Sequence, residues 1–410
     1  MKTEFDREAL LFYSNLIIKN IEDIGWERYD PVDLRYLPLA NKGIWIRKFI
    51  LILEMYMPVY MRKILKIKKK SYPTAYSFVA GAYEIFERCG IPIQSKQTSI
   101  QVIEKCLEKY VTTEGGDIWW NYYKNKVLYP DDSRSERRPT MCLHFIARCN
   151  QVLFAIGKLY NRKDLIDISK KTLDKTLDYH EIIQTEENQE SICYYYNSRE
   201  STINVNSEML EWMALYDNTS KYSDHIQKIL NMILANQQED GSWNYFSIWH
   251  KENISNTLGG IDAHHTATII YNLIHYAELE KKKDLHEVII SINKGMEFFL
   301  KKFFNPLDGE GKVVLGKRRV AGPVQYAESV IALIDYIKSP IDFDKLIRKN
   351  AEEILPKIMK QMLSLVNESD GSVPSDKIIK RIHLDSIRWG NGPVLFAIAK
   401  YMEFCQVYTW

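Results

Sequence analysis

The sequence predicts an all-α protein in which six helical hairpins close into an (α/α)6 toroid, with an inner and an outer layer of helices. Two observations support this fold class. Apolar helices rich in small residues recur at intervals of roughly 60 to 68 residues, which indicates a repeat architecture. Longer, more charged amphipathic helices alternate with them, and several of these are followed by an Asp-Gly or Gly-Asp turn and a polar loop.

The expected inner helices begin near Tyr72, Thr140, Ile203, Asp262, Gly322 and Arg388. Several are almost apolar around their circumference, which is typical of helices buried on more than one side. Their bodies are expected at residues 75–86, 143–159, 209–215, 267–279, 327–337 and 394–402.

The expected outer helices are apolar on one face only and follow their inner partners. The N-terminal helix, residues 6–24, supplies the sixth and packs against the last inner helix, because an open array would leave uncapped end faces. We therefore expect one domain over residues 1–410, in which residues 1–70 close the ring and residues 71–410 form the repeated hairpins. The other outer helices are expected at residues 99–110, 164–178, 222–235, 284–303 and 342–365.

The composition excludes several classes of protein. The chain has 410 residues and a formal net charge of +2, so no overall field favours nucleic acid. Six scattered cysteines form no Cys-x-x-Cys pair, which argues against a zinc site and a disulfide framework. The polar N-terminus is unlike a signal peptide. We expect a cytoplasmic protein without a cofactor or a bound metal.

A second helix is expected over residues 44–67, interrupted at Pro58. Its apolar run, residues 49–61, is too short for a membrane span and leads into the basic residues Lys66, Lys68, Lys69 and Lys70. The segment fits either a peripheral contact with an anionic membrane or a packed helix with a solvated basic end. The sequence favours the packed helix.

A candidate site lies where the inner helices start, because six helix N-termini converge there with free N–H groups and partial positive charge. The long loops at this end are aromatic and basic, which suits an acidic carbohydrate, since aromatic faces stack on sugar rings and arginines pair with carboxylates. The predicted substrate-binding residues are Trp120, Arg199, Trp243, Tyr326, Arg381, Arg388 and Trp389.

The predicted catalytic residues are Tyr245, Asp262, His264, His265 and Glu328. Four of them have a purely structural alternative: Asp262 as a helix N-cap, the two histidines as helix-start packing, and Glu328, like Glu208, as a carboxylate that complements a helix dipole. Adjacent histidines point in different directions from a helix and do not suit a metal. Arg388 fits a ligand clamp or an internal salt bridge, and the turn before Trp243 fits turn chemistry alone.

Several motifs resemble, in order along nearly the whole chain, the bacterial and archaeal polysaccharide-biosynthesis proteins of the capsule and biofilm-matrix type. The opening motif departs from that family at Arg28, where glycine is usual, and at Val32, where tyrosine is usual. The motifs that carry the resemblance are residues 26–33, 58–70, 238–243, 262–267, 370–372 and 388–390.

The resemblance implies an α/α toroid and a role in the production of surface glycans, without an assigned mechanism. Two groups of proteins on the same architecture offer analogies, namely glucuronyl C5-epimerases, with a similar Asp-Gly-Ser turn, and unsaturated-uronyl hydrolases. The leading hypothesis is C5 epimerisation or β-elimination on a glycan that contains uronic acid, since both reactions begin by removing the proton α to a carboxylate.

Three alternatives remain open. Glycoside hydrolysis would use Asp262 and Glu328 as its two carboxylates. A non-catalytic protein would bind glycan, or the machinery that assembles it, through the same aromatic and basic loops. Terpenoid cyclisation is suggested by the Gln-to-Trp turn at residues 238–243, but the chain has no Asp-x-Asp-Asp motif.

Overall fold

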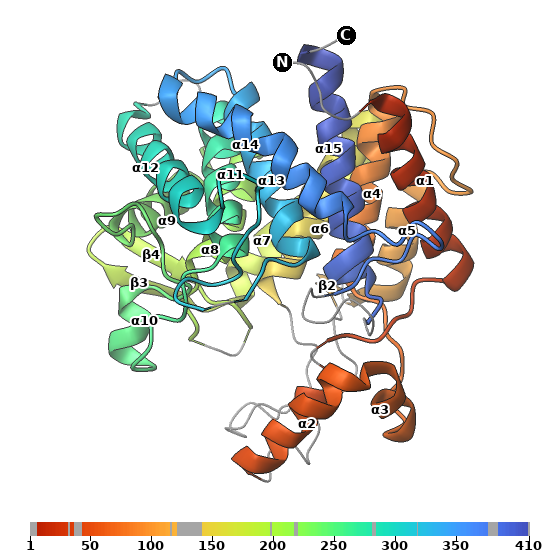
Figure 1. Ribbon diagram of the computed structural model, residues 1–410. Coiled ribbons are helices and arrows are strands. Elements are labelled where there is room, and N and C mark those ends of the chain that lie inside the picture. Colours follow the sequence, from red (N-terminus) through yellow and green to blue (C-terminus); the bar gives the residue numbers. More distant parts are fainter. Residues whose placement is uncertain are drawn as a thin grey trace.

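The fold is a closed ring of six inner helices surrounded by an outer layer (Figure 1). The computed structural model describes residues 6–31, 33–36, 43–114, 117–120, 142–196, 199–216, 220–280, 284–317, 319–375 and 384–408. Each inner helix packs against the next, and the last packs against the first, which confirms the (α/α)6 toroid. The inner helices are α4 (Pro73–Arg88), α6 (Leu143–Leu159), α8 (Ile203–Ala214), α11 (Ala263–Leu279), α13 (Pro323–Lys338) and α15 (Gly392–Tyr408).

Burial separates the two layers as the hydrophobic patterns predict. The inner helix α13 buries 14 of its 16 residues, whereas the outer helix α9 buries five of its 13 along a single stripe. The N-terminal helix packs against α15, as expected. The outer helices are α1 (Arg7–Ile24), α5 (Ser99–Tyr110), α7 (Lys163–Tyr179), α9 (Ser223–Ala235), α12 (His286–Phe303) and α14 (Lys345–Leu363).

The Asp-Gly turns join neighbouring hairpins. Gly241, Gly309 and Gly371 all have positive φ angles, between 70° and 91°. A Cβ atom on Gly241 would lie 2.3 Å from the Lys294 carbonyl oxygen of α12, and one on Gly371 would lie 2.1 Å from the Leu16 carbonyl oxygen of α1. Only glycine combines this backbone conformation with such close packing, so these turns are structural joints between hairpins.

Small elements that the sequence did not predict lie in the loops before the inner helices. Two antiparallel hairpins pair Val111 with Trp120 and Ile182 with Ile192. A π-helical turn, η5 (Ile387–Asn391), leads into α15. The other small elements are η1 (Asp33–Tyr36), β1 (Val111–Glu114), β2 (Asp117–Trp120), β3 (Ile182–Glu186), β4 (Gln189–Ile192) and α10 (Ile248–Asn253).

Helices α2 (Ile44–Tyr56) and α3 (Pro58–Ile64) stand apart from the ring (Figure 1). The break at Pro58 confirms the prediction. The expectation of a packed helix is only half correct, because Ile46 and Ile50 of α2 pack with Leu34 of η1 and Met61 of α3, while the opposite side is exposed. Among the described residues, no helix is long and apolar enough to cross a membrane.

Candidate functional site

Ionisable side chains from the first turns of the inner helices meet inside the ring. We call this group the axial site. His144 of α6 contacts Glu208 of α8, and Arg148 of α6 contacts Glu328 of α13. These groups also interact electrostatically with His265 at the start of α11. Since α6 and α13 are not neighbours in the ring, the second contact crosses its interior. The axial site consists of His144, Arg148, Glu208, Asp262, His264, His265, Glu328 and Arg388.

His144 and Glu208 form a neutral pair. His144 Nδ1 lies 2.9 Å from both carboxyl oxygens of Glu208. Burial raises the pKa of Glu208 to about 8, although Arg148 opposes the shift, and burial together with Arg148 lowers the pKa of His144 to about 3. At pH 7 the protonated Glu208 therefore donates to His144 Nδ1, and the pair holds a proton in the middle of the site.

Asp262 and His265 form a pair of the opposite kind. Asp262 caps α11, because one of its oxygens accepts from the His265 backbone N–H at 3.0 Å, and its other oxygen lies 2.5 Å from His265 Nδ1. Burial disfavours the charge on Asp262, but the contact with His265 outweighs it and lowers the pKa of the carboxyl. The ionised Asp262 accepts from His265 Nδ1–H, so Nε2 is the ring nitrogen of His265 that lies outside this contact.

Two further predicted residues lie beside this pair. The centroid of the Tyr245 ring lies 4.6 Å from that of the His265 ring, and the centroid of the His264 ring lies 4.8 Å from it. Burial and the neighbouring His265 lower the pKa of His264 well below its usual range, so this ring is neutral. The structure thus brings Tyr245, Asp262, His264 and His265 together, while their roles remain predictions.

Arg148 carries a positive charge inside the ring. It lies 3.1 Å from the Glu328 carboxylate, donates to Tyr271 Oη at 3.0 Å, and its guanidinium is 4.2 Å from the centre of the Phe78 ring. Burial works against the charge, but Glu328 and Tyr271 raise the pKa of Arg148 above its usual range. Glu328 is fully buried in this ion pair. Its geometry therefore fits a counter-ion to Arg148 rather than the second free carboxylate of a hydrolase.

Arg388 and Trp389 lie in the π-helical turn η5, just before α15, and share Asp30 as a partner. Arg388 is 3.5 Å from the Asp30 carboxylate, and Trp389 Nε1 donates to the same oxygen at 3.3 Å. The guanidinium of Arg388 also faces the rings of Phe145 and Tyr72, at 4.6 and 5.1 Å. Arg388 is therefore both an ion-pair partner and an aromatic-lined cation, with 15% of its side chain exposed.

Three of the aromatic side chains predicted to bind substrate are buried in the hydrophobic core, not exposed at the axial site. Trp243 donates to the Ile233 carbonyl at 3.0 Å and packs on Gly295, Trp120 donates to Thr172 Oγ1 at 3.4 Å, and Tyr326 Oη accepts from the Gly311 N–H at 3.0 Å. Each is 2% exposed or less. The prediction that these rings stack on a sugar does not fit, because their faces are covered by protein.

The two remaining arginines are not part of the axial site as described. Arg199 is half-exposed, pairs with Glu181 at 2.8 Å and lies over the Trp249 ring at 5.4 Å. Arg381 lies outside the described residues.

His144, Arg148 and Tyr271 were not among the predicted site residues. A signal for them exists, because polar residues four apart, such as His144 and Arg148, interrupt an otherwise apolar inner helix on one face. The stripe His264, Thr268, Tyr271 and His275 does the same on α11.

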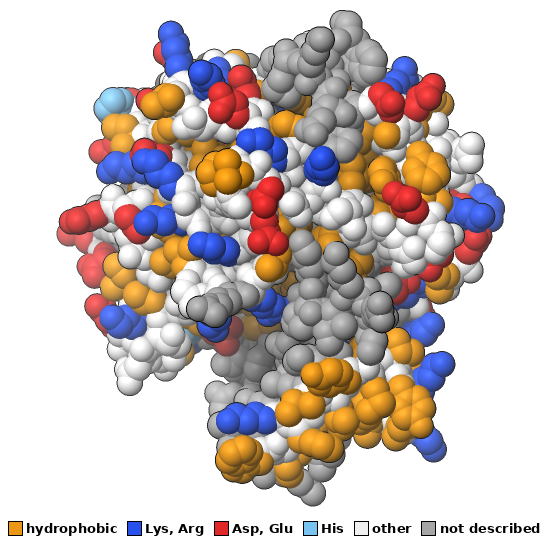
Figure 2. Space-filling model, viewed as in Figure 1, with side chains coloured by type: hydrophobic (Ala, Val, Ile, Leu, Met, Phe, Trp, Pro, Cys, Tyr) orange, Lys and Arg blue, Asp and Glu red, His pale blue; other side chains and the backbone are white. Residues whose placement is uncertain are grey.

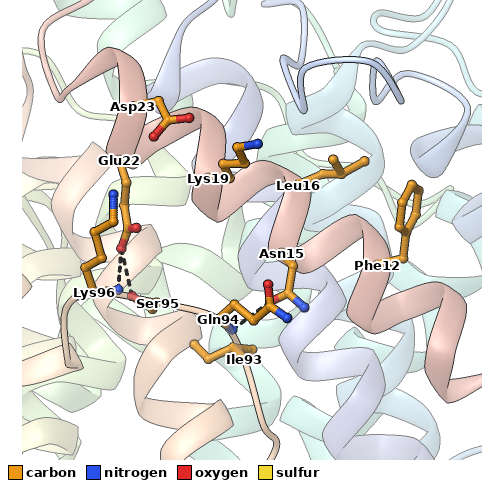
Figure 3. A pocket seen from close by; sticks show the side chains of 10 residues that line it. All are labelled: Phe12, Asn15, Leu16, Lys19, Glu22, Asp23, Ile93, Gln94, Ser95 and Lys96. Carbon is orange, nitrogen blue, oxygen red and sulfur yellow. Dashed lines mark hydrogen bonds between the residues drawn. The ribbon is translucent and has the colours of Figure 1, made fainter.

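A cavity of about 700 Å³ lies elsewhere (Figure 3). It is formed by α1 and the connection from α4 to α5, which follows the C-terminal end of α4. Glu22 lies on one side of it and accepts hydrogen bonds from Ser95 Oγ and from the Lys96 N–H (Figure 3). The cavity is lined by Phe12, Asn15, Leu16, Lys19, Glu22, Asp23, Ile93, Gln94, Ser95 and Lys96, so it is separate from the axial site.

No family model and no curated protein matches the chain, but solved structures share its fold. A GH76 α-mannanase from Bacteroides thetaiotaomicron superposes with a TM-score of 0.61 at 8% identity, over 92% of this chain and 99% of that one. A sugar epimerase from a ruminal bacterium gives 0.56 at 11% identity, over 81% and 88%. An unsaturated glucuronyl hydrolase from Streptococcus agalactiae gives 0.58 at 13% identity, over 96% and 90%. The protein therefore has the toroid fold of the six-hairpin glycosidases.

Proposed function

We propose that the protein is a carbohydrate-active enzyme of surface-polysaccharide biosynthesis that abstracts the C5 proton of a uronic acid in a glycan. The feature that carries this proposal is a pair of histidine–carboxyl contacts within one site, in which the pKa values of the two carboxyl groups are shifted in opposite directions. His265 is oriented by an ionised carboxylate, whereas His144 is bonded to a protonated one. Titratable pairs whose environments separate their pKa values are typical of paired acid and base catalysts.

In the proposed reaction, His265 Nε2 takes the proton from C5 and the C5–H electron pair moves into the carboxylate to form an enolate. Arg388 holds the substrate carboxylate, and the buried positive charge of Arg148 stabilises the growing negative charge. For epimerisation, the Glu208–His144 pair returns a proton to the opposite face of C5. For β-elimination, the C4–O bond breaks instead, a C4=C5 double bond forms, and the same pair protonates the departing oxygen.

A second candidate is glycoside hydrolysis, which the raised pKa of Glu208 favours. A carboxyl group that keeps its proton near pH 7 is suited to protonate a glycosidic oxygen. Asp262, which stays ionised, would then activate water or attack the anomeric carbon. This assignment replaces the pair of Asp262 and Glu328, since Glu328 is committed to Arg148.

The remaining alternatives have less support. A binding or assembly protein needs no separation of pKa values, so the shifts at His144 and Glu208 count against it. Terpenoid cyclisation requires an apolar cavity for a hydrocarbon, whereas the axial site is lined with ionisable groups.

The test is NMR of uronate-containing polysaccharides incubated with the protein in D2O. The proposal predicts deuterium at C5, which His265→Gln abolishes and the exposed control His286→Gln leaves unchanged. A new reducing end without exchange or unsaturation would identify the hydrolase instead. Glycan binding without exchange or cleavage would overturn both and support a binding protein.

A further inference from the structure

Helices α2 and α3 concentrate exposed apolar side chains outside the ring. Eight of the 19 exposed large hydrophobic residues among the described part of the chain lie within residues 45–64, and Trp45, Phe49 and Tyr60 are 77%, 60% and 60% exposed. Contiguous exposed patches of this kind mark interaction surfaces. We call this surface the α2–α3 face; it consists of Trp45, Phe49, Ile52, Tyr56, Met57, Val59, Tyr60 and Ile64.

The exposed residues follow helical spacing. Trp45, Phe49, Ile52 and Tyr56 lie four, three and four residues apart, so they form one stripe along α2. The packing against η1 uses a different side of the helix, through Ile46 and Ile50. Helix α2 is thus apolar on two sides, of which the protein covers one.

The charge of this segment differs from that of the rest of the chain. Residues 44–70 contain eight Lys or Arg and a single acidic residue, Glu54, a formal charge of +7. Because the whole chain has a formal charge of +2, the remaining residues together carry −5. Exposed lysines at positions 48, 63, 66 and 68 belong to the same segment, and Figure 2 shows basic groups at the border of the apolar surface.

We propose that the α2–α3 face docks on a lipid bilayer that carries anionic headgroups. Helices of 13 and seven residues are too short to span a bilayer but can lie in its interface. Trp and Tyr favour this depth, and apolar insertion combined with a basic cluster provides the two signals that peripheral binding needs. A protein-binding surface fits less well, because the cores of protein interfaces are depleted in lysine.

The docking face is connected to the axial site. Arg62 of α3 is fully buried and donates to the Asp30 carbonyl at 2.8 Å, while the Asp30 side chain accepts from Arg388 and Trp389. Bilayer docking therefore holds this side of the axial site close to the membrane. If the proposed function is correct, the glycan substrate is one held near a membrane surface.

The experiment measures co-sedimentation of the full chain with phosphatidylcholine vesicles that contain about a third phosphatidylglycerol. We expect binding that is at least about tenfold weaker on pure phosphatidylcholine and that declines with salt. Replacing Phe49 and Ile52 by Gln removes apolar anchors without changing charge, and we expect a loss of about tenfold or more. The matched control is Leu307→Gln with Leu346→Gln, at sites that are 84% and 68% exposed on the ring.

The basic component is tested separately. Changing Lys63, Lys66 and Lys68 to Gln is expected to weaken binding by roughly 100-fold at low salt, at about fivefold per lysine. The control changes the exposed Lys163, Lys170 and Lys171 of α7 to Gln. Equal binding to neutral and anionic vesicles, or equal losses in the controls, would overturn the proposal.

Two further outcomes are informative. If the Phe49/Ile52 variant converts an oligomer to a monomer in light scattering, and vesicle binding is absent, a second copy of the chain covers the face and the lipid proposal is wrong. All variants should retain C5 exchange on soluble glycan. If the wild type catalysed no C5 exchange but still bound vesicles, the proposed function would be contradicted and the lipid-docking proposal would remain supported.

Discussion

Two clusters of histidine and carboxyl groups lie on the same inner helices, yet the pKa of the histidine is lowered in one cluster and raised in the other. In the axial site, the pKa of His144 is lowered to about 3, whereas the pKa of His275, further along the ring interior, is raised to about 10. We call the second group the deep cluster; it consists of Glu211, His275, Asp335, Lys338 and Lys400.

Exposure does not explain this difference, because the His144 side chain is 15% exposed and that of His275 is 23% exposed. Burial lowers the pKa of both. His275, however, lies between Glu211 at 3.0 Å and Asp335 at 2.9 Å. His144 contacts the carboxyl group of Glu208, and the cations Arg148 and Arg388 lower its pKa more than Glu328 raises it. The charges that surround an imidazole therefore decide its protonation in this ring.

The largest expected effect distinguishes the clusters by activity. Glu208→Gln removes the proton donor of the axial site without changing the charge of its protonated form, so we expect a 10²- to 10⁴-fold fall in C5 exchange. The free energy of unfolding at pH 7 should change little. For the deep cluster we expect the reverse, namely a large change in the free energy of unfolding and little change in C5 exchange. A Glu208→Gln variant with full activity would show that Glu208 has no part in the mechanism.

Asp335→Ala is expected to cost about 3–5 kcal/mol of stability. The change would leave His275, Lys338 and Lys400 without their shared, fully buried partner. Removing one member of a buried ion pair is costly because the remaining charges stay buried without compensation. Urea unfolding measures the loss. Asp164→Asn, in a half-exposed pair with Arg162, is the control and should show no measurable change.

The pH dependence of stability should have opposite signs for the two histidines. Because the pKa of His144 falls from 6.5 to about 3 on folding, its contribution makes the protein more stable as pH rises across that range. The pKa of His275 rises from 6.5 to about 10, so its stabilisation is complete below pH 6.5 and is lost toward pH 10.

Over its full pH range, each effect on the free energy of unfolding is on the order of 5 kcal/mol. Urea unfolding of the wild type, His144→Gln and His275→Gln between pH 4 and 9.5 separates them. His144→Gln should flatten the acid limb and His275→Gln the alkaline limb. Variants that alter the same limb would show that the two sites do not differ.

A smaller effect is expected outside both clusters, at the joints between hairpins. Gly371→Ala forces a Cβ atom against the Leu16 carbonyl and should destabilise the protein by about 1–3 kcal/mol. Gly90→Ala has a similar positive φ of 63° but nothing within 4 Å of the added atom, so only the backbone cost of about 1 kcal/mol is expected. Thermal unfolding of both variants tests the difference, and equal losses would indicate that the close packing is unimportant.

The ring was predictable because its signals are local. Repeated apolar helices, Pro73 and Pro323 at helix starts and the Asp262 cap all appear in the sequence and place α4, α13 and α11 within a residue or two. The strands β1 to β4 were missed because segments of four or five residues carry little periodic signal.

The axial site was predicted only in part. Asp262, His264, His265 and Arg388 lie in motifs that the sequence displays. His144 and Arg148 could not be assigned to the site from the sequence, because their partners Glu208 and Glu328 are 64 and 180 residues away along the chain. Trp243 illustrates the converse, because a sequence motif cannot show which side of a turn its aromatic ring faces.

The most direct test of the central claim is a histidine NMR titration with specific assignment of His144 and His275. We expect His144 to stay a neutral imidazole down to about pH 4 and His275 to stay an imidazolium up to about pH 9. If both rings titrated together near pH 6.5, the separation of the two clusters, and the acid and base roles built on the axial site, would be contradicted.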